Sequence, residues 1–298
     1  MDFDPKQTQA LLAVADCGSF EAAALQLHLS ASAVSQRVRA LETRLGQPLL
    51  TRARPCRPTP AGKKLLQYLR RSAMLAEEFA AEFAGTAQTA WCVRIAVNYD
   101  SLETWLLPAL APVLRQEHLL LDIRADDQAY THQLLESGEV VAAVSAKPET
   151  MRGCEAQPLG ALRYRLLATP AFRQRYFAEG MDAAALRAAP LLVFNRKDAL
   201  QTAFLQQHFH VQATRCPMHL IPSTQAFFQA VQLGLGYGMI PDLQGEQLLQ
   251  SGEMVDLLPG RFMDVLLYWH HWHNQSPKQA RLNQQLVAQA RTYLLQLA

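Results

Sequence analysis

A short stretch that begins at Ser30 carries side chains able to make hydrogen bonds to nucleic acid. These polar residues are Ser32, Ser35, Gln36 and Arg39. Their hydroxyl, amide and guanidinium groups are the kinds that meet base edges and phosphates in a major groove. Apolar residues recur between them at helical spacing, at Val34, Val38, Leu41 and Leu45. The pattern predicts a helix with one buried and one polar face, and it favours a DNA-reading helix over a generic solvated one.

Basic residues are concentrated around this stretch. From residue 30 to residue 71 the chain has ten basic residues and one acid, Glu42, although the net charge of the protein is only +2. A basic block beside a neutral remainder is typical of a domain that binds phosphates, although charge alone also allows a solvated cationic face. A hairpin after Gly46 would act as a wing that touches phosphates or a minor groove. Its basic residues are Arg52, Arg54 and Arg57.

Residues 1–58 contain the elements that would position these groups. Residues 5–17 predict a helix that ends at Gly18, and Ser19 predicts the N-cap of a short second helix. The third helix is expected to start at Ser30 or Ser32 and to end at Gly46. Prolines interrupt any further helix, and residues 49–53 predict a short strand. A winged helix-turn-helix is the expected arrangement.

A long helix is expected after the wing. Thr59 and Pro60 form a good N-cap and first-position pair, and the helix should reach about Phe83. Its apolar residues are too many for a solitary helix, so residues 59–86 are interpreted as a dimer-forming linker. These apolar residues are Leu65, Leu66, Leu69, Met74, Leu75, Phe79 and Phe83.

From Trp91 onward, strand candidates alternate with helix candidates. This order predicts an α/β domain over residues 87–298 with a largely parallel sheet, and an α+β chain overall. A late strand and the helix after Ser276 would return the chain to its first lobe. The expected lobes are therefore about 90–160 together with 267–298, and about 161–266, joined by two crossovers.

Ligands in such sheets bind where strands end and helix N-termini present free amides. Asp100 with Glu103 resembles a capping box, and Thr224 lies at another helix start. Facing one another, two such ends would suit a carboxylate, although simple capping is the alternative for each. The expected effector-binding residues are Asn98, Tyr99, Asp100, Ser101, Asp127, Ser145, Phe194, Ser223 and Thr224. A cation on the ligand would need Asp100, Asp126 or Asp127.

Other motifs carry little chemistry. The GxGxG run at 234–238 follows a helix and precedes a strand, which is the reverse of a dinucleotide loop. His270, His271 and His273 have no paired cysteine or carboxylate nearby, which favours a structural role over a metal site. The five cysteines are scattered singly, and MDFDPKQTQ is not a signal peptide. We therefore expect a cytoplasmic protein without catalytic residues, metal or cofactor.

One long stretch resembles a known family. GSFEAAALQLHLSASAVSQRVRALETRLGQPLL, followed by Arg52 and by TPAG at 59–62, is similar to the fingerprint of LysR-type transcription regulators. The resemblance implies a winged helix-turn-helix, a dimerising linker helix, and a two-lobed effector domain built like periplasmic binding proteins. It also implies that the polar residues of the third helix contact DNA, with Arg52 in the wing. One departure is Ala31, where many members carry glutamine.

Three further stretches resemble the branch of that family that controls arginine and lysine export. They are DSLETWLLPALAPV at 100–113, LLESGEVVAAVS at 134–145 and LLYWHHW at 266–272. The resemblance implies that the partners are promoter DNA, a basic amino acid and RNA polymerase, and that the chain forms a dimer or a tetramer. It implies no association with a membrane. The alternatives are a ligand-independent architectural DNA-binding protein and a LysR-type regulator of another small anionic metabolite.

Overall fold

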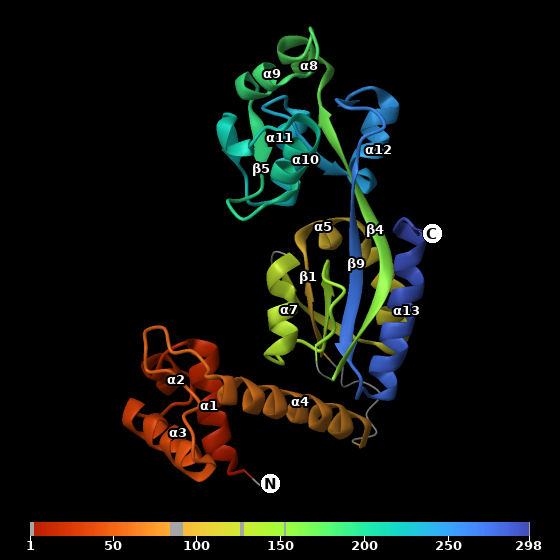
Figure 1. Ribbon diagram of the computed structural model, residues 1–298. Helices are drawn as coiled ribbons and strands as arrows, with labels where there is room; N and C mark the ends of the chain where they lie inside the picture. The colour runs from red at the N-terminus through yellow and green to blue at the C-terminus, as the bar shows by residue number, and fades with distance from the viewer. Residues whose placement is uncertain (1–2, 84–91, 126–127, 152, 298) are drawn as a thin grey trace. The chain divides into compact units, whose positions relative to one another are not determined.

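The computed structural model describes residues 3–83, 92–125, 128–151 and 153–297 (Figure 1). It divides into two compact units. The first contains the N-terminal helices with residues 120–122 and 133–141, and the second contains most of the chain from Ile95 onward. None of the described helices is long and apolar enough to cross a membrane.

Three short helices open the chain at the predicted positions. They are α1 (Pro5–Cys17), α2 (Phe20–Gln26) and α3 (Ala31–Leu45). The Ser19 hydroxyl accepts a hydrogen bond from the backbone of α2, and Ser30 rather than Ser32 caps α3 in the same way. Gly18 ends α1 in the left-handed region at φ 70°, which glycine enters without a Cβ penalty. These local signals therefore determine where α1 ends and where α2 and α3 begin.

The buried face of α3 fixes the direction of its polar face. Val34, Val38 and Leu41 are fully buried and belong to one core cluster with Leu11 and Ala23 of the first two helices. Burying such aliphatic side chains stabilises the fold by roughly 1.5–3 kcal/mol each. Because the helical repeat places apolar and polar residues on opposite faces of α3, its polar residues point away from the core.

The wing is less regular than the sequence suggests. The predicted strand at 49–53 is wrong, because the hairpin holds only an isolated bridge between Leu50 and Pro58. Two backbone hydrogen bonds join its sides, from Thr51 N to Arg57 O at 2.7 Å and from Thr59 N to Leu49 O at 2.9 Å. Proline has no N–H to extend a ladder, so the proline-rich loop cannot form a longer strand pair.

The long helix α4 (Pro60–Phe83) follows directly. The Thr59 hydroxyl accepts from Gly62 N at 3.1 Å, which confirms the predicted cap. A Cβ at Gly62 would lie 1.9 Å from the Leu49 carbonyl oxygen, so only glycine lets the helix approach the wing so closely. Leu66 is buried in the N-terminal core and Leu69 packs against it.

The remaining chain builds a seven-stranded sheet in the order β2-β1-β3-β9-β4-β7, with β8 paired to β4. Its strands are β1 (Cys92–Val97), β2 (Leu120–Ala125), β3 (Ala142–Ser145), β4 (Cys154–Ala168), β7 (Gly238–Pro241), β8 (Val255–Asp256) and β9 (Met263–Trp272). A separate parallel pair joins β5 (Leu191–Val193) and β6 (Met218–Leu220).

The prediction of a largely parallel sheet is wrong. β1 pairs with β3 in parallel, but β9 is antiparallel to both β3 and β4, and β4 is antiparallel to β7. The reason is the long pair of β4 and β9, which run side by side from Cys154 opposite Trp272 to Tyr164 opposite Met263 (Figure 1). The chain leaves the first lobe along β4 and returns along β9.

Helices connect the strands. Those before β3 or after β9 are α5 (Tyr99–Ser101), a π-helical turn (Leu102–Leu106), α6 (Leu107–Glu117), α7 (Gln128–Glu136) and α13 (Pro277–Tyr293). Those between β4 and β9 are α8 (Pro170–Tyr176), α9 (Ala183–Ala188), α10 (Leu200–Phe209), a 3₁₀ turn (Ala213–Arg215), α11 (Thr224–Gln232) and α12 (Asp242–Ser251). The predicted capping box at Asp100 and Glu103 is wrong: the N-cap of α5 is Asn98, whose side chain makes no capping hydrogen bond.

Candidate functional site

The polar face of α3 lies open on the first unit. Ser32, Gln36 and Arg39 are exposed, and Ser35 is half-buried. All four lie on the side that the core leaves free, at the spacing of successive helical turns. A helix that presents a hydroxyl, an amide and a guanidinium group in this way can enter a major groove.

The wing arginines are also exposed, and two of them form ion pairs with acidic side chains. Arg52 lies 3.7 Å from Glu42, and Arg54 lies 3.6 Å from Glu21, while Arg57 is exposed. Glu42 does more, because its Oε1 accepts from Leu49 N at 2.8 Å and from Leu50 N at 3.3 Å. This carboxylate therefore ties the start of the wing to α3. Sequence reasoning missed it, although a lone acid inside a basic block was a usable signal.

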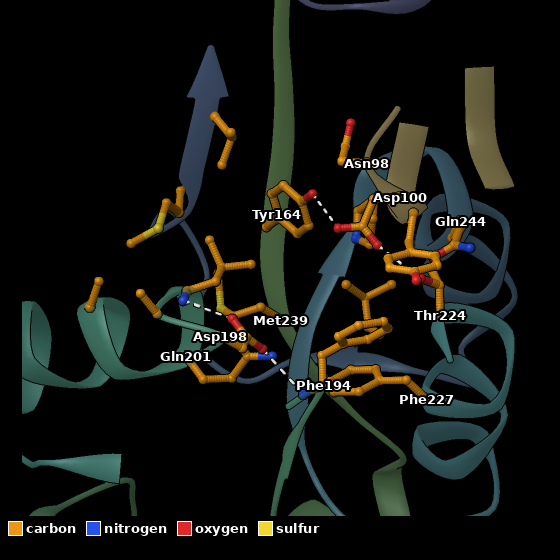
Figure 2. Close-up of a pocket in the computed structure, with 18 of the residues that line it drawn as sticks. Asn98, Asp100, Tyr164, Phe194, Asp198, Gln201, Thr224, Phe227, Met239 and Gln244 are labelled. Carbon is orange, nitrogen blue, oxygen red and sulfur yellow. Dashed lines mark hydrogen bonds between the residues drawn. The ribbon is translucent and has the colours of Figure 1, made fainter. Parts of the chain in front are cut away.

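The second unit contains a cavity of about 410 Å³. Its polar lining residues are Asn98, Tyr99, Asp100, Tyr164, Lys197, Asp198, Gln201, Thr224 and Gln244, and its apolar lining includes Phe194, Phe227 and Met239. A cavity of this size and mixed lining is typical of small-molecule sites. The α5 turn supplies one wall, and β4 supplies Tyr164 (Figure 2). The other walls come from the loop before α10 with the start of that helix, from α11, from the β7 strand with Gln244 of α12, and from β9.

Asp100 is one of the acids that line this pocket. Its Oδ2 accepts from the Tyr164 hydroxyl at 2.6 Å, and its Oδ1 accepts from the Thr224 hydroxyl at 3.2 Å (Figure 2). Burial raises the pKa of the Asp100 carboxyl, while these two hydrogen bonds oppose the rise. A single carboxylate thus connects the first lobe, the crossover strand and the first residue of α11.

Five of the predicted effector residues line the pocket: Asn98, Tyr99, Asp100, Phe194 and Thr224. The Tyr99 and Phe194 rings contact one another across it, with centroids 5.3 Å apart. These residues come from both lobes, so the structure brings together groups that are far apart in the sequence.

The other predicted effector residues lie elsewhere. Ser101 is fully buried but does not line the cavity, and the Ser145 hydroxyl accepts from Lys147 N at 3.1 Å. Ser223 caps α11 by accepting from Ala226 N at 3.4 Å. Asp126 and Asp127 lie outside the described residues. Local hydrogen bonds thus explain the Ser145 and Ser223 side chains without a ligand, whereas the buried Ser101 hydroxyl has no hydrogen-bond partner among the described residues.

Sequence reasoning missed the rest of the polar lining, notably Tyr164, Asp198, Gln201 and Gln244. Asp198 follows β5, and an acid soon after a strand end was a usable signal. No local pattern marks Tyr164, because only the pairing of β4 with β9 decides where along β4 the pocket lies.

The histidines of β9 have an acid nearby after all. His271 Nε2 lies 4.0 Å and His273 Nδ1 3.9 Å from a carboxylate oxygen of Glu155 on β4. His270 Nε2 lies 2.8 Å from the Lys147 carbonyl oxygen. Burial lowers the pKa of His270, which suits a neutral ring in the sheet. Across the described residues, the structure contains no group of three or more ligands that could hold a metal ion.

Comparison with known proteins agrees with both parts of the fold. Residues 5–63 match the family described as bacterial regulatory helix-turn-helix protein, lysR family, and residues 91–291 match the LysR substrate binding domain. The chain therefore belongs to the LysR family of transcriptional regulators.

Within that family, the similar proteins include regulators named ArgP and LysG. The HTH-type transcriptional regulator ArgP of Klebsiella pneumoniae is 43% identical over 284 residues, which is 95% of each chain. The crystal structure of ArgP from Mycobacterium tuberculosis superposes with a TM-score of 0.84 at 38% identity and covers 100% of both chains. Full-length LysG from Corynebacterium glutamicum, with bound effector Arg, gives a TM-score of 0.79 at 35% identity, over 99% of this chain and 100% of that one.

Proposed function

We propose that this LysR-type regulator binds lysine or arginine and controls a gene for an amino-acid exporter. The observation that carries the proposal is the buried Asp100 carboxylate, inside a cavity that also contains Asp198. Two acids in one partly apolar cavity favour a cationic ligand, because a desolvated cation needs a carboxylate partner. The arginine in the LysG structure supports the same ligand class.

The pocket also has a place for the carboxylate of an amino acid. Thr224 is the first residue of α11, where free backbone N–H groups and the helix dipole favour an anion. Its hydroxyl faces the cavity beside Asp100. A ligand with an α-carboxylate next to an α-ammonium fits the backbone N–H groups at the start of α11 and the neighbouring Asp100 carboxylate. We infer that the chain acts by binding this ligand rather than by catalysis.

We further propose a homodimer that binds promoter DNA in the cytoplasm, with a tetramer and RNA polymerase as further assemblies. We also propose that residues 1–58 form the DNA-binding domain, residues 59–86 the linker helix and residues 87–298 a two-lobed effector domain. The exposed residues Tyr68, Leu75 and Phe79 support the dimer, because spacings of seven and four place them on one face of α4. Effector binding would regulate transcription if the ligand prefers one arrangement of the two lobes.

Calorimetry on the full chain tests the effector. Lysine or arginine should give a saturable binding signal, whereas leucine and glutamate should give none, because neither presents a distal cation. Leucine is the control for apolar contact, and glutamate is the control for charge. Tight binding of an acidic or aromatic metabolite, without a response to lysine or arginine, would contradict the proposed effector and leave the family assignment intact.

DNA binding should fail by different routes in α3 and in the wing. Gln36→Ala should cost about 1–3 kcal/mol on the cognate site alone, because an amide reads base edges. Arg52→Ala should weaken binding to all sequences and reduce the salt slope by about 1, because its guanidinium neutralises a phosphate. Arg173→Ala in the effector domain is the matched control. Fluorescence anisotropy with cognate and random duplexes at several salt concentrations measures both, and equal losses for Gln36→Ala on the two duplexes would refute the assignment of α3.

A further inference from the structure

The second acid of the pocket, Asp198, is held rigidly in the loop between β5 and α10. Its Oδ2 accepts from Phe194 N at 3.2 Å, and its Oδ1 accepts from Leu200 N at 2.9 Å (Figure 2). These bonds fix the orientation of the carboxylate on the second-lobe wall. A carboxylate has about four acceptor positions, so holding the loop and meeting a ligand cation are compatible roles.

Asp198 and Asp100 act on one another electrostatically. Both line the same cavity, from different lobes. Burial is the main cause that raises the pKa of Asp100, and repulsion from Asp198 adds to it. A ligand cation beside each carboxylate relieves this repulsion, because it offsets the negative charge that the other acid faces.

Three amide side chains of the pocket wall, those of Asn98, Gln201 and Gln244, have buried polar atoms without a hydrogen-bond partner among the described residues. Gln201, in the first turn of α10, is only 3% exposed, and its Oε1 accepts no hydrogen bond. Asn98 is equally buried, and neither its Oδ1 nor its Nδ2 has a partner. A buried polar group without a partner costs free energy, which a ligand with matching donors recovers. Gln201 lies three residues after Asp198 in the sequence, so a charged and a neutral acceptor come from the same short segment.

We propose that Asp198 and Gln201 bind the distal cation of the ligand, while Asp100 binds its α-ammonium. The α-carboxylate belongs beside Thr224 at the start of α11, and Asp100 is within hydrogen-bond distance of that residue. The α-ammonium is attached to the same carbon as the α-carboxylate, so it reaches Asp100. The aliphatic chain then passes the Tyr99 and Phe194 rings, and its far end reaches the wall that carries Asp198. Asp198 thereby separates basic from neutral amino acids. This inference rests on the proposed effector class.

A cycle that changes the protein charge and the ligand charge together tests this assignment. Arginine and citrulline have the same length and the same α-groups, but citrulline is neutral at its far end. Calorimetry with the full chain should show that Asp198→Asn weakens arginine binding by about 10- to 100-fold, as expected for a lost charged hydrogen bond. The same variant should change citrulline binding by less than about threefold, because citrulline has no distal charge for Asp198 to pair with. Asp100→Asn should weaken both ligands by similar factors.

Asp182→Asn is the matched control, because Asp182 also accepts two backbone N–H groups, from Ala184 and Ala185, outside this pocket. Gln201→Leu is a second probe that leaves the Asp198 loop intact, and it should weaken arginine binding about tenfold without lowering the Tm. Equal weakening of arginine and citrulline by Asp198→Asn would assign Asp198 a purely structural role and overturn the proposal. Failure of the wild-type chain to bind either arginine or lysine would instead refute the effector class, and the assignment with it.

Discussion

An Asp100→Asn variant will unfold at a higher temperature than the wild-type chain at neutral pH, yet it will lose most of its affinity for a basic effector. Burial raises the pKa of the Asp100 carboxyl in the folded protein, so the folded chain holds this proton more readily than the unfolded chain does. The contribution to stability is therefore present at low pH and is lost as pH rises through the raised pKa. At neutral pH the wild-type chain buries a charged carboxylate, and asparagine removes that cost.

Binding will change in the opposite direction. A ligand ammonium that loses its buried carboxylate partner costs roughly 2–5 kcal/mol, so the dissociation constant should rise at least about thirtyfold. For the wild-type chain, affinity should fall as pH drops through the raised pKa, because the protonated carboxyl no longer attracts the cation. Calorimetry measures the affinity, and thermal unfolding near pH 7.5 and near pH 4.5 measures the stability, with the larger difference in Tm at the higher pH.

Glu246→Gln is a matched control for this experiment, since Glu246 lies exposed on α12 and does not line the pocket. It should change neither the Tm nor the affinity. An Asp100→Asn chain that is less stable than the wild type and still binds arginine normally would show that Asp100 is a structural acid and not a ligand site.

Leu75→Asp should dissociate the proposed dimer and abolish tight operator binding. Leu75 is 46% exposed and lies on the same face of α4 as Tyr68 and Phe79. If a second copy covers this face, the substitution buries an unpaired charge, which is strongly unfavourable. A monomer engages one half-site only and loses the benefit of linkage, so affinity for a two-half-site operator should fall by at least about 100-fold.

Analytical ultracentrifugation and anisotropy with the operator duplex measure the two effects. Ala73→Asp places the same charge on another face of α4, where it is exposed, and should leave both unchanged. Leu69 also belongs to the apolar residues of α4, but it is a poor site for this test because it packs against the N-terminal core. An unchanged oligomer for Leu75→Asp would mean that α4 is not the dimer interface.

The sequence by itself determined the N-terminal elements of this protein and its family. The helices α1 to α4 begin where caps and prolines predict, and α1 and α3 end at the predicted glycines, because these signals act within a few residues of each boundary. The buried stripe of α3 likewise follows from helical periodicity, and with it the outward direction of Gln36 and Arg39. Both features depend on local chemistry that a reader of the chain can see.

Only the tertiary structure decided the pocket and the sheet. Periodicity identifies strands but not their partners, so the antiparallel pairing of β4 with β9 could not be read from the chain. That pairing brings Tyr164 to Asp100, which lies 64 positions earlier in the chain. Thr224 donates to the same carboxylate from 124 positions further along the chain. Asp100, which the sequence suggested as a helix cap, therefore joins distant segments instead. Asp198 and Gln201 likewise line the pocket only in the folded chain, because the pocket is built from several distant segments.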